Sequence, residues 1–244
     1  MSVLGNLAVS DDIQESRDTV GGNGPLDSGV YPATIKAVYL KKSAGGALSA
    51  NIHMDIEGRE IRQALWITSG DAKGNRNYYE RDGQKRYLPG FELFRSLSLM
   101  TTGKEPSDLE PEDGVMKLWN PDEKKELPTE VPLVKELTGA QIQVGLMRER
   151  VDKTERADDG SYVPTGETRE QNEVDKFFHA ENGLTLVEAL AGETEGKFIN
   201  TWRDKWTGQV RDKSTGGTEA PAGSAPATPA ANTGATAPKK SLFG

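Results

Sequence analysis

The chain of 244 residues contains no cysteine and only two histidines. Without cysteine it has no disulfide framework, no thiolate zinc site and no cysteine nucleophile, which is typical of a reducing compartment. Hydrophobic residues make up 34% of the chain, below the share of about 45–50% that is usual for globular proteins. This deficit predicts one folded domain accompanied by segments that do not fold.

Long apolar runs are also missing. No stretch approaches the roughly 20 residues that a membrane span needs. The first residues, MSVLGNLAVSDDIQE, become acidic before the apolar core of a secretory signal could form. We therefore expect a soluble, cytoplasmic protein without a membrane partner.

Recognisable catalytic motifs are absent as well. The chain has no GxxxxGK[ST] phosphate loop, no HExxH, no GxSxG and no CxxC. His53 and His179 are isolated and do not have the spacing of a metal pair. We expect no enzymatic activity, no cofactor and no metal site. A nuclease that holds magnesium with carboxylates is the enzymatic alternative.

Composition divides the chain into three parts. Residues 1–28 end in the turn-rich GGNGPLDSG and are expected to form a flexible arm. Residues 214–244 are rich in Ala, Pro, Gly, Thr and Ser, and we expect disorder because they bury too little apolar surface to offset the entropy of ordering. Residues 29–213 then form the folded domain. Leu242 and Phe243 give the tail an apolar tip, which is either solvated or a docking peptide for a partner protein.

Alternating apolar residues predict strands at 31–39, 48–56 and 61–67, joined by short turns that contain glycine. Helical spacing after Pro89-Gly90 predicts a short helix over 91–100. Further strands are expected at 115–119, 130–134, 141–151, 162–163 and 172–178, with a turn at Asp159-Gly160 and helices at 184–190 and 198–206. Thr185 is the expected N-cap of the first of these helices.

The order of these elements predicts an all-β fold with one or more short helices. A five-strand β barrel with a helix between its third and fourth strands is the arrangement of an OB-fold. A β-sandwich is the competing architecture, because strand order and closure do not follow from the pattern.

The strongest candidate site is the segment 69–90, which is polar, basic and rich in glycine, with Asp82-Gly83 as a hairpin tip. The strand before it carries Arg62 and Trp66 on the face opposite Leu65 and its apolar neighbours. Single-stranded nucleic acid offers phosphates to cations and base faces to aromatic rings. The expected phosphate-binding residues are Arg62, Lys73, Arg76, Arg81, Lys85 and Arg86, and the expected stacking residues are Trp66, Tyr78, Tyr79 and Tyr87.

The charge distribution agrees with this interpretation, although the formal net charge is −8. Residues 21–100 carry 11 basic and 8 acidic side chains, whereas residues 101–213 carry 16 basic and 25 acidic ones. Local clusters decide binding more than the total does. The competing interpretation is a flexible charged loop whose tyrosines pack locally.

A second basic cluster and a pair of adjacent phenylalanines are weaker candidates. Arg148, Arg150, Lys153 and Arg156 form a second basic cluster, but neighbouring carboxylates indicate a salt-bridged hairpin. Phe177 and Phe178 are adjacent, so one is expected to face the core and the other is a candidate for stacking.

Several segments resemble a group of bacteriophage-encoded single-stranded-DNA-binding proteins. The most specific are TSGDAKGNRNYY with YLPGF (68–79 and 87–91) and TGETREQNEVDKFF (165–178), within a similarity that runs from about Leu4 to Lys213. The resemblance implies an OB-fold protein of the host cytoplasm that coats single-stranded DNA in phage DNA replication, recombination and repair. It also implies a tail that recruits replication proteins such as DNA polymerase, although relatives by function end in an acidic tail and this one ends in PKKSLFG. A non-enzymatic phage module for protein interaction or structure is the alternative function.

Overall fold

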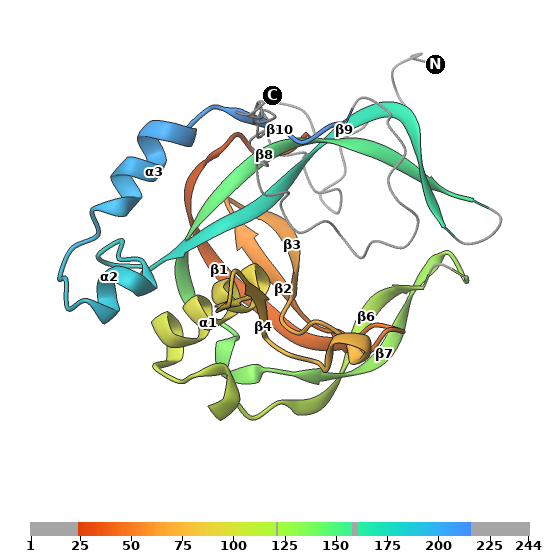
Figure 1. The fold of residues 1–244 in the computed structure, drawn as a ribbon, viewed down its shortest axis with the longest axis horizontal. Coiled ribbons are helices and arrows are strands. Elements are labelled where there is room, and N and C mark those ends of the chain that lie inside the picture. The colour runs from red at the N-terminus through yellow and green to blue at the C-terminus, as the bar shows by residue number, and fades with distance from the viewer. Residues whose placement is uncertain (1–23, 121, 158–160, 216–244) are drawn as a thin grey trace, which may run out of the picture.

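In a computed structural model of the chain, residues 24–120, 122–157 and 161–215 are described (Figure 1). They form a mostly β protein with a large antiparallel sheet and a few short helices, which confirms the all-β prediction at this level. The strands are β1 Gly29–Lys42, β2 Leu48–Ile56, β3 Arg59–Trp66, β4 Tyr78–Arg81, β5 Gln84–Tyr87, β6 Glu112–Asn120, β7 Lys125–Leu133, β8 Gln141–Arg156, β9 Tyr162–Phe178 and β10 Val210–Asp212. The helices are α1 Pro89–Thr102, α2 Leu186–Leu190 and α3 Phe198–Trp206.

The large sheet has the strand order β10-β8-β1-β2-β3, with β9 paired to β8 and the β6–β7 hairpin joined to β1 through β7. The long strand β1 organises it, because residues 29–34 pair with β8 and residues 34–42 pair with β2. The β4–β5 hairpin is a separate two-stranded sheet. In Figure 1 it lies in front of β2, beside α1.

Strand β2 shows why the meander forms. Its predicted apolar face is confirmed, since Ala50, Ile52, Met54 and Ile56 are fully buried. Strand β3 continues the sheet after a two-residue turn at Glu57-Gly58, where φ is 52° and 77°. Both residues with positive φ match the primed turns that suit the twist of a hairpin.

The side chain of Gln63 connects β3 with β9. The pairing pattern of the described residues contains no backbone ladder between β3 and β9. Gln63 of β3 is buried, and its amide nitrogen donates to Glu173 at 3.1 Å. Its amide oxygen accepts from the backbone N–H of Val174 at 3.0 Å. Gln63 therefore makes the polar link between β3 and β9.

The domain has two apolar cores on opposite faces of the sheet. The larger core buries Phe94 and Leu97 of α1 against the sheet, together with Phe177. The smaller core packs Phe178 and Met147 against Trp202 of α3. The prediction that one of the two adjacent phenylalanines is available for stacking is therefore wrong, because α3 covers the face opposite the main core and both rings are at most 1% exposed.

The ends of the described chain pack on the domain. Leu26 and Ser28, from the expected N-terminal arm, are buried, and the Ser28 hydroxyl donates to the carbonyl of Gln209 at 2.6 Å. The predicted Asp159-Gly160 turn and the tail residues Leu242 and Phe243 lie outside the described residues. Among the helices that are described, none has the length and apolar character to span a membrane.

Candidate nucleic-acid interface

The basic segment folds into the β4–β5 hairpin, and its predicted tip at Asp82-Gly83 is confirmed. Both tip residues have positive φ, 53° and 72°. The register pairs Tyr78 with Tyr87, Tyr79 with Arg86, Glu80 with Lys85 and Arg81 with Gln84. Opposed residues of an antiparallel pair share a face. One face therefore presents Tyr79 with Arg86 and Arg81, and the other presents the remaining two tyrosines with the Glu–Lys pair.

Backbone hydrogen bonds attach this hairpin to the sheet. The N–H of Leu88 donates to Asn77 at 2.8 Å, which closes the base of the hairpin. The N–H of Ser69 donates to Arg76 at 2.9 Å, and the N–H of Asp71 donates to Gly45 in the β1–β2 turn at 2.9 Å. The loop that precedes β4 is thus fixed to the same end of the sheet as that turn.

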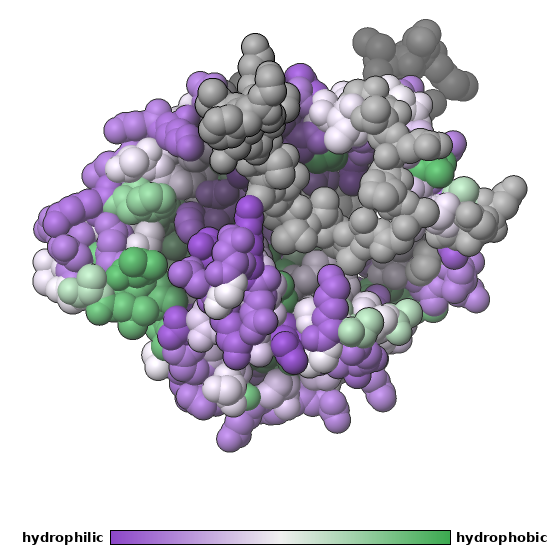
Figure 2. All heavy atoms as spheres, viewed as in Figure 1, coloured by the Kyte–Doolittle hydropathy of each residue, from purple (hydrophilic) through white to green (hydrophobic). Residues whose placement is uncertain are grey.

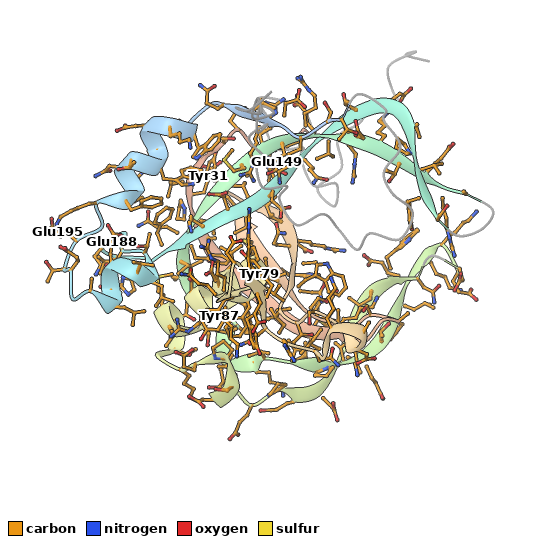
Figure 3. The ribbon with its side chains drawn as sticks, in the orientation of Figure 1. Tyr31, Tyr79, Tyr87, Glu149, Glu188 and Glu195 are labelled. Atoms are coloured by element: carbon orange, nitrogen blue, oxygen red, sulfur yellow. The ribbon has the colours of Figure 1, made fainter. Side chains whose placement is uncertain are left out.

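Cations and rings are in contact within the hairpin. The Lys85 ammonium lies 5.0 Å from the centroid of the Tyr78 ring, and the Arg76 guanidinium lies 5.6 Å from it. Tyr87 packs against Phe91 of α1 with 5.0 Å between ring centroids. Tyr79 and Tyr87 remain 38% and 46% exposed, and both lie near the middle of the view in Figure 3. The two exposed rings are therefore accessible for stacking.

An open pocket of about 420 Å³ lies where the hairpin meets the preceding loop. It is lined by Ser69, Lys73, Arg76, Tyr78, Tyr79, Glu80 and Leu88. The structure thus brings four of the predicted site residues to one cavity. The surface over the position of β4 is strongly hydrophilic in Figure 2.

The cations of this hairpin and of the loop before it differ from the second basic cluster in their ion-pair partners. Within the described ranges, Lys73, Arg76, Lys85 and Arg86 make no ion pair, and Arg81 approaches only its neighbour Asp82, at 3.7 Å. Three of the four cations of the second cluster are paired with carboxylates, which confirms the salt-bridged hairpin for Arg148, Arg150 and Lys153. Its pairs are Arg148 with Asp27 and Glu170, Arg150 with Glu170 and Asp212, and Lys153 with Glu167.

The outer face of β3 carries the two remaining predicted residues. Trp66 is partly buried, and α1 begins so close to it that a Cβ on Gly90 would lie 2.8 Å from the Trp66 backbone nitrogen. Arg62 donates to Glu60 at 2.6 Å and lies 3.7 Å from Glu126. The hydrogen bond to Glu60 raises the pKa of Arg62. Arg62 is thus already paired with carboxylates, unlike the hairpin cations.

No protein-family model and no curated protein matches this chain. In the described part of the chain, no group of three or more His, Asp or Glu side chains is arranged to hold a metal ion. The roles of the side chains therefore rest on their geometry and charge.

A charge network surrounds the buried Glu149 of β8. Glu149 is 1% exposed and accepts hydrogen bonds from Arg211 of β10, and Lys213 lies 2.9 Å from it. Arg211 also donates to Asp175 at 3.1 Å. Burial, followed by the charge of Glu149, raises the pKa of Glu173. Arg211 and Lys213 therefore already pair with carboxylates inside the domain.

Sequence reasoning missed Trp119 as a candidate. Its side chain is 59% exposed on β6, directly opposite Glu126 of β7. Because opposed residues share a face, Trp119 lies on the side of the β6–β7 hairpin from which Glu126 reaches Arg62. The sequence places Val115, Lys117 and Trp119 on one face of a predicted strand. Alternation alone does not say whether that face is buried or exposed to solvent.

Proposed function

We propose that this chain binds single-stranded DNA without sequence preference and without catalysing a reaction on it, in phage DNA replication and recombination. One observation carries the proposal: the β4–β5 hairpin and the loop before it hold four cations that make no ion pair in the described residues. Two of these cations contact the Tyr78 ring, and two line the open pocket. Cations that lack a carboxylate partner are free to neutralise phosphates.

The two chemistries that a single strand requires occur together on this hairpin. Stacking of a base on an aromatic side chain contributes about 1–3 kcal/mol. Tyr79 has the exposure for stacking, and Arg86 lies opposite it in register to contact the adjoining phosphate. Paired bases hide their faces, so we expect a preference for single strands over duplex DNA.

The finer fold assignment belongs to the same proposal. We infer that β1, β2, β3, β8 and β9 correspond to the five strands of an OB-fold, with α1 between the third and fourth. The antiparallel pairs β1–β2, β2–β3, β1–β8 and β8–β9 support this order. The Gln63 link stands where such a barrel would close. OB-folds bind oligonucleotides on the face of their second and third strands, which here includes Trp66.

The test is a titration of the full chain with poly-dT, followed by its intrinsic fluorescence at low and at high salt. Saturable quenching that weakens with salt and is absent with duplex DNA of equal length is the expected result. No change with any strand at low salt would refute the proposal. Stacking alone does not read the sugar, so the stacking residues by themselves do not select DNA over RNA. A parallel titration with poly-rU measures whether the chain prefers one of them.

A protein-interaction module is the second candidate. The exposed Trp119 favours it, because tryptophan, tyrosine and arginine are enriched at protein interfaces. Absorbance at 260 nm during purification separates the two candidates. Nucleic acid that copurifies and is removed by high salt supports DNA binding, whereas its absence at low salt supports the module.

A further inference from the structure

Large apolar side chains are exposed together where α2 meets α3. Val187 and Leu190 of α2 are 77% and 66% exposed, and Phe198 at the start of α3 is 40% exposed. Val187 and Leu190 are three residues apart and so lie on one side of the helix. Figure 2 shows a hydrophobic area over the position that α2 has in Figure 1. These three residues are called the α2–α3 patch below.

The α2–α3 patch is built into the fold. The Glu188 carboxylate of α2 accepts from the backbone N–H groups of Lys197 and Phe198, each at 2.8 Å, and from that of Thr185 at 2.9 Å. Ile199, next to Phe198, is buried in the smaller core. The start of α3 is therefore held against α2, and the exposed side chains keep their relative positions.

The segment that carries α2 is rich in acidic residues. Residues 181–196 contain four glutamates and no basic residue. Glu193 pairs with Lys197 at 2.9 Å, whereas Glu181 and Glu195 have no ion pair within the described chain. Glu188 and Glu195 lie together at the edge of the molecule in Figure 3. A surface that is both apolar and negative fits a ligand that is apolar and positive.

One segment of this chain has that chemistry. Lys239–Phe243 reads KKSLF, whereas residues 216–238 contain no large apolar side chain. The apolar start of residues 1–23 is a poorer match, because the first 20 residues contain four acidic residues and one arginine. We propose that Lys239–Phe243 docks on the α2–α3 patch of its own molecule, with Leu242 and Phe243 on the apolar side chains and the lysines beside the glutamates.

The connecting chain is long enough for this contact. Two segments separate the start of α3, where the patch lies, from Thr215. Helix α3 spans about 14 Å at 1.5 Å per residue, and residues 207–215 add at most about 30 Å. The 24 residues from Thr215 to Lys239 reach up to about 80 Å when extended and average about 27 Å as a coil. A tether of this length gives an effective concentration near the millimolar range, so a weak contact is sufficient.

The test uses a spin label on the full chain. Because the sequence has no cysteine, Thr236→Cys provides a single attachment site for a nitroxide outside the docking segment. We expect loss of amide NMR signal intensity for the α2–α3 patch when the label is oxidised, and recovery when it is reduced. Leu242→Ser with Phe243→Ser in the same labelled chain is the matched control and should abolish the loss. High salt should weaken it by screening the lysines.

Two results would overturn the proposal. One is that the amide signals lose intensity on another surface, such as the β4–β5 hairpin, or lose it nowhere selectively. The other is that the α2–α3 patch of an isotope-labelled chain loses signal intensity when that chain is mixed with a spin-labelled, isotope-free chain, which would mean docking between molecules. The experiment contains no DNA, so its outcome is independent of the proposed DNA binding.

Discussion

Arg86 offers the sharpest test of the hairpin as a phosphate-binding element. It lies directly opposite Tyr79 and, among the described residues, makes no ion pair. Its removal therefore breaks no ion pair among the described residues. If it contacts one phosphate, Arg86→Ala should lower the salt slope of binding by about 0.7, the value for a single strand.

The size of this effect is measurable. Four unpaired cations in the hairpin and the loop before it predict a wild-type slope of about −3 in a plot of log affinity against log salt. A slope difference of about 0.7 changes the ratio of wild-type to variant affinity by about 2.6-fold between roughly 50 and 200 mM salt. Fluorescence titrations with oligo-dT at four or more salt concentrations resolve a change of this size.

A matched control comes from the second basic cluster. Arg150 is bound to Glu170 at 3.2 Å and to Asp212 at 3.4 Å. Arg150→Ala removes the same side chain from a site that is already neutralised, so the slope should stay at the wild-type value. Equal slopes for wild type and Arg86→Ala, or an equal decrease in both variants, would refute the assignment. Thermal melts of both variants establish that the fold is retained.

The remaining predictions concern stacking, pH and packing. Trp66→Ala should weaken binding by about 1–3 kcal/mol with an unchanged salt slope, and a changed slope would contradict a stacking role. Because the pKa of Glu173 is raised, the folded state binds the proton of this carboxyl group more tightly than the unfolded chain does. The stability that the proton contributes is lost as pH rises above the unfolded pKa of 4.5. Glu173→Gln keeps an acceptor for Gln63 and should raise the melting temperature more at pH 7 than at pH 4; a larger gain at pH 4 would contradict this. Gly90→Ala should destabilise the fold by about 1–3 kcal/mol, because its Cβ meets the backbone of Trp66, and an unchanged denaturation midpoint would show that α1 shifts without cost.

Elements with a strong local signal could be predicted from the sequence. Strand β2 occupies the predicted 48–56, because its alternating apolar residues form a fully buried face. Helix α3 has the predicted bounds. The Thr185 N-cap of α2 is confirmed, since its hydroxyl accepts from the N–H of Glu188 and the Glu188 carboxylate accepts from the N–H of Thr185. In each case the local pattern and the tertiary environment agree.

Strand β9 could not be predicted as one element. It runs continuously from Tyr162 to Phe178, whereas the sequence indicated two short pieces. Its first half is exposed and pairs with the outer half of β8, so it needs no apolar alternation. Pro164 and Gly166 further obscure the pattern. A strand stabilised only by its neighbour leaves little trace in its own sequence.

Contacts between distant segments account for the other differences. Gln63 occupies a core-facing position in an otherwise apolar alternation, and its partners are 110 and 111 residues away. Phe178 is buried by α3, which follows it in the chain and packs on the face opposite the main core. Neither arrangement follows from residue spacing, because each depends on how two elements meet in space.

Charge pairing explains how an acidic chain can bind a polyanion. A cation that already pairs with a carboxylate gains little from a phosphate, since the first contact must be broken. On this criterion Arg148 and Arg211 are poor phosphate ligands, because both already pair with carboxylates. Lys73 and Arg86 lack such partners in the described chain and add their full charge to the local field. The net charge of −8 is therefore a poor guide to binding, and the distribution of unpaired cations is a better one.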